Sequence, residues 1–200
     1  MPHDPTELAA LIGSRICHDL VSPIGAIGNG VELLAMAGAA GPEVRLIAES
    51  VAAANARIRF FRIAFGAATP GQRVALPEIR LLLDDLTRGG RLSFDWQVPG
   101  DQPRGIVKLA FLVLQCCETA LPFGGRVTIA AADGAWQILA EADKLKIDDA
   151  LWARLAGSGG QAEGTVAPAQ VQFALAPTEA AVLGRALQVT RAPGRVEIRF

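Results

Sequence analysis

The sequence predicts a two-part α+β protein, in which a long helical hairpin precedes a mixed domain of helices and strands. Up to about residue 66, apolar residues recur every third or fourth position, as in long amphipathic helices. After Pro70, shorter helical stretches alternate with stretches of period two, which are typical of strands. A chain of 200 residues that is 51% hydrophobic can build two small cores. We therefore expect one unit over residues 1–69 and another over 70–200.

The first predicted helix contains the stretch "SRICHDLVSPIGAIGNGVELL" and carries one apolar stripe. The stripe consists of Leu8, Ile12, Ile16, Leu20, Ile24, Ile27, Val31 and Leu34. His18 lies about 200° around the helix from this stripe, so it should point into solvent. Pro23 lacks the amide that would bond the carbonyl of Asp19, so we expect a kink or a loosened turn just after His18.

The second predicted helix, "PEVRLIAESVAAANARIRFFRIAF", carries a stripe of its own. Its members are Val44, Ile47, Val51, Ala54, Ile58, Phe61 and Phe65, with spacings of three and four that are typical of a helical bundle. Pro42 suits a first helical position, and Gly66 suits a helix end. One hairpin cannot bury both stripes. The sequence therefore predicts a homodimer in which two hairpins form a four-helix bundle.

The remaining residues predict a layered α+β domain. The expected elements are a short helix from Pro77, a strand over 91–98, an apolar helix over 106–121, a hairpin turning at Asp133 and Gly134, a short helix over 148–157, a helical stretch over 166–184 broken at Pro177, and a hairpin turning near Pro193 and Gly194. Trp96, Trp136 and Trp152 are expected to fill its core.

Composition excludes several classes of function. The net charge of −1, with both signs interspersed, provides no basic stripe, so nucleic acid and anionic membranes are not expected partners. No apolar run is long enough to span a membrane, and the N-terminal residues do not resemble a secretory signal. Cys17, Cys116 and Cys117 form neither an even set nor a CxxC pair, which favours a reducing compartment and argues against zinc. We expect a cytoplasmic protein.

The stretch "HDLVSP", which begins at His18, resembles the histidine–acid–Leu–x–x–Pro motif in the dimerisation domain of two-component histidine kinases. The longer stretch from Ser14 to Leu34 is similar to the ChpT-type histidine phosphotransferases of alphaproteobacterial phosphorelays. The resemblance implies that His18 carries a phosphoryl group and that Asp19 orients its imidazole or holds its proton. It also implies that residues 70–200 form a domain related to the kinase ATPase domain.

The chemistry requires an exposed imidazole. A neutral histidine, with an unperturbed pKa of about 6.5, can attack the phosphorus of an acyl phosphate at neutral pH. Arg15, Ser22 and Asn29 lie within about 60° of His18 on the helical projection. Arg15 could neutralise phosphoryl charge, and Ser22 and Asn29 could donate hydrogen bonds to the phosphoryl group or to a partner. Each of them, like Asp19, could equally be an ordinary solvated side chain.

The second domain lacks the features by which kinases bind ATP. The helix "LAFLVLQCCETAL" contains no asparagine to hold magnesium, and Lys144 and Lys146 stand where an adenine-binding turn would need glycine. The "GSGG" stretch at 157–160 lacks the lysine of a P-loop and fits a shortened lid remnant. We therefore expect a degenerate ATPase-like domain with no bound cofactor or metal, the magnesium being supplied by the partner receiver domain.

These observations predict a phosphotransferase acting through phosphohistidine. His18 would accept a phosphoryl group from a receiver aspartate, such as that of a hybrid histidine kinase, and pass it to the receivers of response regulators. Two alternatives stay open: a divergent ATP-using kinase core, and a non-catalytic dimeric scaffold. Arg57, Arg59 and Arg62 in the second helix are expected to be solvated, or alternatively to meet acidic receiver surfaces.

Overall fold

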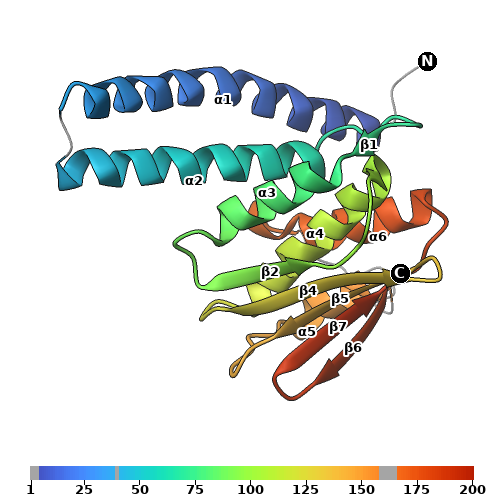
Figure 1. Cartoon of the computed structure of the whole chain (residues 1–200). Helices are drawn as coiled ribbons and strands as arrows, with labels where there is room; N and C mark the ends of the chain where they lie inside the picture. Colours follow the sequence, from blue (N-terminus) through green and yellow to red (C-terminus); the bar gives the residue numbers. More distant parts are fainter. Residues whose placement is uncertain (1–4, 39–40, 158–165) are drawn as a thin grey trace.

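The chain folds into a long helical hairpin that lies against a mixed-sheet domain (Figure 1). The computed structural model describes residues 5–38, 41–157 and 166–200. Helix α1 (Pro5–Met36) and helix α2 (Pro42–Ala64) run antiparallel, as the two apolar stripes predicted. The predicted fold class, a helical hairpin followed by an α+β domain, is thus confirmed. His3 and most of the "GSGG" stretch lie outside the described residues.

The apolar stripe of α1 does not face a single neighbour. Cys17 and Val31 are buried. Six members of the predicted stripe instead remain between 44% and 54% exposed: Leu8, Ile12, Ile16, Leu20, Ile27 and Leu34. This exposure agrees with the expectation that one hairpin cannot bury both stripes by itself. Only a narrow strip of α1 packs on α2, and the larger apolar side chains lie on an adjacent face.

Glycines allow the two long helices to approach closely. A Cβ atom at Gly13 would lie 2.9 Å from the carbonyl oxygen of Phe65, and one at Gly28 would lie 3.3 Å from Cγ1 of Val51. These contacts also give the register of the hairpin. Helix α1 continues through Pro23, so this proline does not interrupt it.

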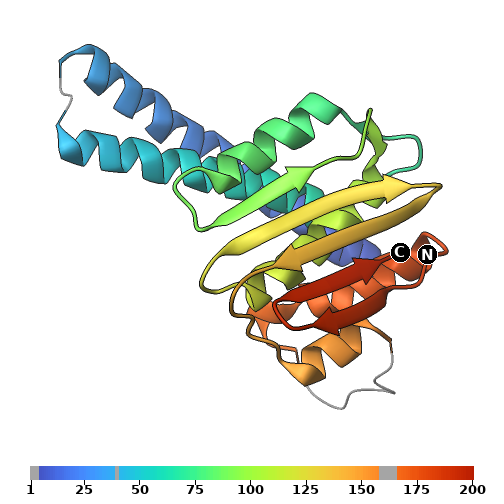
Figure 2. The same ribbon diagram turned by 60° about the horizontal axis from the view of Figure 1, so that its bottom comes forward.

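The second domain is built on a five-stranded sheet of order β2-β4-β5-β7-β6. Its main elements are α3 (Leu76–Thr87), β2 (Leu92–Trp96), α4 (Arg104–Ala120), β4 (Gly125–Ala132), β5 (Ala135–Glu141), α5 (Asp149–Leu155), α6 (Gln172–Val182), β6 (Gln188–Ala192) and β7 (Arg195–Arg199). Strands β2 and β4 are parallel, and the other neighbouring pairs are antiparallel. The helices lie along one face of the sheet, and the opposite face is open to view in Figure 2.

The elements of this domain follow the sequence prediction closely, except at Pro177 and at one short pair of strands. The β4–β5 turn has left-handed backbone at Asp133 (φ 51°) and Gly134 (φ 80°), as a tight hairpin requires. The expected break at Pro177 was wrong, because α6 runs through this proline after a short 3₁₀ helix, η1 (Pro168–Gln170). The pair of two-residue strands β1 (Arg73–Val74) and β3 (Gln102–Pro103) is too short for a periodic signal.

The core of the second domain surrounds α4, which lies between the sheet and the hairpin (Figure 1). Trp96, Trp136 and Trp152 are buried, as predicted. Cys116 and Cys117 are fully buried in α4, and burial raises the pKa of both thiols. All three cysteines are free and buried, which fits their predicted role as small apolar residues.

The hairpin and the second domain share this core. Phe60 of α2 stacks on Phe111 of α4, with ring centroids 4.5 Å apart. Two arginines of α2 form ion pairs across the same junction: Arg57 with Glu118 (3.0 Å), and Arg59 with Asp85 (2.6 Å). Both side chains stay partly solvated, at 43% and 40% exposure, but each guanidinium is already paired within the chain, so the alternative that they are free to meet receivers was wrong. The boundary near residue 70 stays a prediction, because α2 belongs to both units.

Candidate functional site

His18 projects from the middle of α1, and its side chain is 84% exposed. This is the orientation that the helical projection predicted. The neighbouring Cys17 points inward and is buried, so the two adjacent residues show how sharply α1 divides its inner from its outer surface. Because most of the His18 side chain is exposed, an approaching molecule can reach its ring without displacing the core.

A carboxylate holds the imidazole. The Nδ1 atom of His18 lies 3.2 Å from Oδ1 of Asp19. The Nε atom of Arg15, one turn earlier, donates to Oδ2 of the same carboxylate at 2.7 Å. Hydrogen bonds from His18 and then from Arg15 lower the pKa of Asp19, so this group stays ionised at neutral pH. The structure thus brings together three of the five predicted site residues.

The hydrogen bond also determines which ring nitrogen is free. An ionised carboxylate only accepts hydrogen bonds, so a neutral His18 must carry its proton on Nδ1. The lone pair then lies on Nε2, on the outer edge of the ring. This is the nucleophilic form that phosphoryl transfer requires.

Ser22 and Asn29 are exposed on α1, one turn and about three turns beyond His18. In the described parts of the chain, neither side chain forms a hydrogen bond with the His18–Asp19–Arg15 group. Their predicted roles stay predictions. They can contact a partner that covers this surface, but they do not shape the imidazole.

Beyond the histidine, a groove of about 550 Å³ runs between α1 and α2. Its lining includes Gly28, Val31 and Glu32 from α1 and Val51 and Asn55 from α2. A second hollow of about 600 Å³ shares Asn55 and continues across Arg59 to Asp85 and Arg88 of the α3 region. The α1 side of the groove begins at Gly28, about 15 Å along the helix from His18, and small side chains line much of it.

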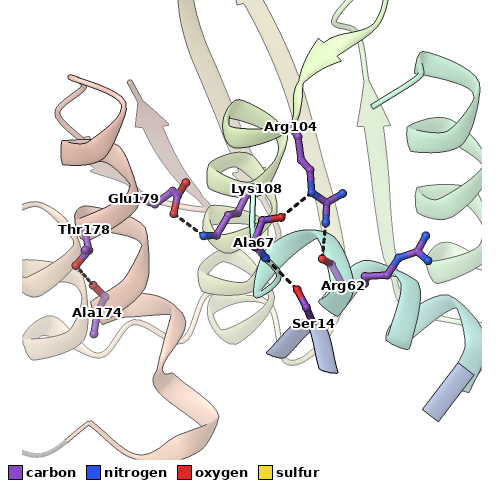
Figure 3. A network of polar contacts seen from close by, with 8 residues as sticks. All are labelled: Ser14, Arg62, Ala67, Arg104, Lys108, Ala174, Thr178 and Glu179. Atoms are coloured by element: carbon purple, nitrogen blue, oxygen red, sulfur yellow. Dashed lines mark hydrogen bonds and ion pairs between the residues drawn. The ribbon is translucent and has the colours of Figure 1, made fainter. Parts of the chain in front are cut away.

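Sequence analysis missed a set of polar contacts at the base of α1 (Figure 3). The hydroxyl of Ser14, one turn before His18, accepts a hydrogen bond from the amide of Ala67 at 3.1 Å. Arg104 of α4 donates to the carbonyl oxygens of Ala67 (3.0 Å) and Arg62 (2.7 Å). These contacts tie the turn that precedes His18 to the end of α2 and to the second domain. Since the residues that form these contacts are distant in sequence, no local motif could predict the contacts.

The helix and turn compared above with nucleotide-binding elements are α4 and the residues that follow β5. Cys116 and Cys117 are buried in α4, and the Nζ atom of Lys144 lies 5.3 Å from the ring centroid of Phe123. The Nε2 atom of Gln115 is buried and lacks a hydrogen-bond partner among the described residues. The same residues contain no cluster of three or more metal-binding side chains. Whether nucleotide binds stays an open prediction.

The arrangement of a helical hairpin ahead of a mixed-sheet domain matches that of a known bacterial phosphotransferase. A solved structure described as a bacterial phosphotransferase matches 100% of this chain and 98% of its own, with a TM-score of 0.69 and 28% sequence identity. Residues 76–195 match the model of the histidine phosphotransferase C-terminal domain. The chain belongs to this family.

A curated relative agrees with this assignment. The protein phosphotransferase ChpT of Brucella abortus (strain 2308) is 39% identical over 127 residues, which are 62% of this chain and 60% of the relative. The chain thus matches about three fifths of that protein's length. The resemblance that "HDLVSP" indicated is confirmed, although the matched family domain begins after the hairpin and does not include His18.

No helix in the part of the chain that the structure describes has both the length and the apolar character needed to cross a bilayer.

Proposed function

We propose that this protein is a histidine phosphotransferase of a phosphorelay. His18 accepts a phosphoryl group from the aspartate of a receiver domain, such as that of a hybrid histidine kinase, and passes it to the receivers of response regulators. The observation that carries the proposal is the exposed imidazole whose Nδ1 atom is held by the Asp19 carboxylate. Membership of the family and the named phosphotransferase relative support it.

The geometry suits a reversible transfer. The Nε2 lone pair of His18 attacks the phosphorus of the aspartyl phosphate, so an N–P bond forms while the acyl P–O bond breaks and the receiver's carboxylate leaves. The Nδ1 proton passes to Asp19 or to water, which gives a neutral phosphoimidazole. Onward transfer reverses these events. Asp19 therefore orients the ring and also lies where that proton is released.

The chain itself supplies no cofactor in this mechanism. A receiver domain brings the aspartate and the magnesium ion, and the histidine protein brings only an oriented nucleophile. Arg15 lies on the exposed side of the same turn but is already engaged with Asp19. We propose the cytoplasm as its compartment, because free buried cysteines fit a reducing environment.

We also propose that the working form is a homodimer. The half-exposed face of α1, which includes Ile12, Ile16, Ile27 and Leu34, is too apolar to remain in water over several helical turns. A second copy would cover it and complete a four-helix bundle. Because His18 lies about 160 to 200° around the helix from Ile16 and Ile27, pairing would leave both histidines accessible.

Label transfer tests the proposed function. A receiver domain carrying a radiolabelled aspartyl phosphate is mixed with the protein in the absence of ATP. The label should appear on the protein in an acid-labile, base-stable form, as expected for a phosphoramidate, and a second receiver should remove it. If no label passes from any receiver that accepts phosphate from its own kinase, the proposal fails.

Asp19→Ala should slow this transfer without abolishing it. The imidazole would lose the partner that fixes its tautomer, and positioned acid–base groups typically contribute about a hundredfold or more. We therefore expect a single-turnover rate at least about tenfold lower. Asp19→Asn is the matched variant, because it keeps the shape but removes the ionised acceptor. Wild-type rates in both variants would show that Asp19 only flanks the histidine.

Magnesium-ATP should not bind the second domain. Calorimetric titration should give no heat of specific binding, and the ligand should not raise the unfolding temperature, because stabilisation by mass action requires binding. Saturable binding at micromolar concentration would instead favour the divergent kinase. Substitution of His18 tests the remaining alternative, because a purely structural scaffold would keep its function without this histidine.

A further inference from the structure

We propose that Arg62, near the end of α2, is a second phosphoryl-binding residue, whose guanidinium contacts the phosphoryl oxygens as they pass to or from His18. The inference rests on the proposed function and adds a catalytic residue from the other helix of the hairpin. It is carried by the register of the two helices, by the side of α2 on which Arg62 lies, and by the absence of a carboxylate partner for Arg62 among the residues that the structure describes.

The register places Arg62 beside the turn of His18. Gly13 lies against Phe65, Ser14 lies against Gly66 and bonds Ala67, and Gly28 lies against Val51. Since α1 and α2 run antiparallel, each step forward along α1 corresponds to a step back along α2. Arg62, one turn before Gly66, is therefore level with the turn of α1 that contains Cys17 and His18.

Arg62 and His18 also lie on the same side of the hairpin. Glu32, about four helical turns after His18 and hence on the same side of α1, lines one groove together with Asn55 of α2. Asn55 and Arg59 in turn line the hollow that reaches Asp85 of α3. Arg62 comes three residues after Arg59, about 60° further round and towards α1. The side chain of Arg62 therefore leaves the hairpin on the same side as the side chain of His18.

Arg62 differs from its neighbours in having a free charge. Arg57 and Arg59 are paired with Glu118 and Asp85, whereas Arg62 is exposed and has no carboxylate partner within the described parts of the chain. Figure 3 shows its carbonyl oxygen held by Arg104 and its side chain directed away from this contact. The backbone of Arg62 is thus fixed, and its guanidinium remains available.

Electrostatics agrees with this position. Burial raises the pKa of the Cys17 thiol, and the positive charge of Arg62 opposes that rise, so the guanidinium lies near the turn of α1 that holds the histidine. During transfer, charge spreads over three phosphoryl oxygens. Arg15 is already bonded to Asp19. A planar guanidinium without a competing carboxylate can instead donate charge-assisted hydrogen bonds to these oxygens.

The test compares Arg62→Gln with Arg195→Gln in single-turnover transfer from a phosphorylated receiver. Arg195 is exposed in β7, so its loss gives the same change of charge far from α1. For Arg62→Gln we expect the rate at saturating receiver to fall about tenfold, as for loss of one charge-assisted hydrogen bond, with the half-saturating concentration within about twofold of wild type. Arg195→Gln should match wild type, and Arg62→Lys should recover part of the rate.

Two outcomes would overturn the inference. An unchanged saturating rate in Arg62→Gln would exclude contact with the phosphoryl group, even if a raised half-saturating concentration showed that Arg62 meets the receiver surface. Recovery of the full rate by Arg62→Lys together with strong salt dependence would likewise indicate a long-range charge effect. Failure of wild-type protein to take up label would instead refute the proposed function. The Arg104 contact is to the backbone of Arg62, so the substitutions leave it in place.

Discussion

His18→Gln is expected to abolish phosphoryl uptake from a labelled receiver. Glutamine keeps a polar side chain of similar length but has no nucleophilic nitrogen, and no second histidine lies in the described part of α1. The His18 side chain is 84% exposed, so its replacement removes almost no packing. Surface substitutions of this kind usually change the free energy of unfolding by no more than about 0.5 kcal/mol.

The measurement pairs two readouts on the same preparation. Label retained after gel separation reports transfer, and thermal or urea unfolding reports stability. We expect complete loss of label with an unfolding curve that overlays wild type. If label persists in the variant, His18 is not the acceptor. The phosphorylated residue would then have to be sought by mass spectrometry, beginning with His3.

The site could be predicted from the sequence as far as its residues are local. His18, Asp19 and Arg15 lie within one turn, so helical geometry alone places them together. Sequence analysis named Arg62 only as a residue that could meet a receiver surface. The proposed contact with the phosphoryl group could not be predicted, because it depends on the register of two antiparallel helices. Glycines at 13 and 28 determine that register through close contacts with α2. A pattern of apolar residues does not specify which turns meet.

The fold shows the same limit. Periodicity predicted both long helices and most elements of the second domain, but not the parallel pairing of β2 with β4, which depends on contacts between distant segments. Periodicity also placed all apolar residues of α1 on one stripe. The structure divides them between a strip that packs on α2 and an adjacent exposed face, because a period of 3.6 does not say which neighbour covers each side chain. The ion pairs of Arg57 and Arg59 join residues 61 and 26 positions apart, so they could not be recognised from spacing.

The second large effect is expected for Ile27→Asp, which should convert the proposed dimer into folded monomers. Ile27 is 49% exposed in the single chain and lies on the apolar face of α1, so the chain's own core does not depend on it. In a twofold bundle each substitution occurs twice, and an unpaired charge buried in an apolar interface costs several kcal/mol. We expect the dissociation constant to rise at least about a hundredfold.

Val182→Asp is the matched control, because Val182 is 74% exposed on α6 and the same change there introduces the same charge away from the hairpin face. Sedimentation equilibrium at micromolar concentration should report two chains for wild type and Val182→Asp, and one chain for Ile27→Asp. Circular dichroism should show that Ile27→Asp remains helical. A wild-type protein that sediments as one chain and unfolds cooperatively would contradict the dimer. In that case the apolar face of α1 would need a different partner, because six half-exposed aliphatic side chains along one helix face are not stable in water without a cover.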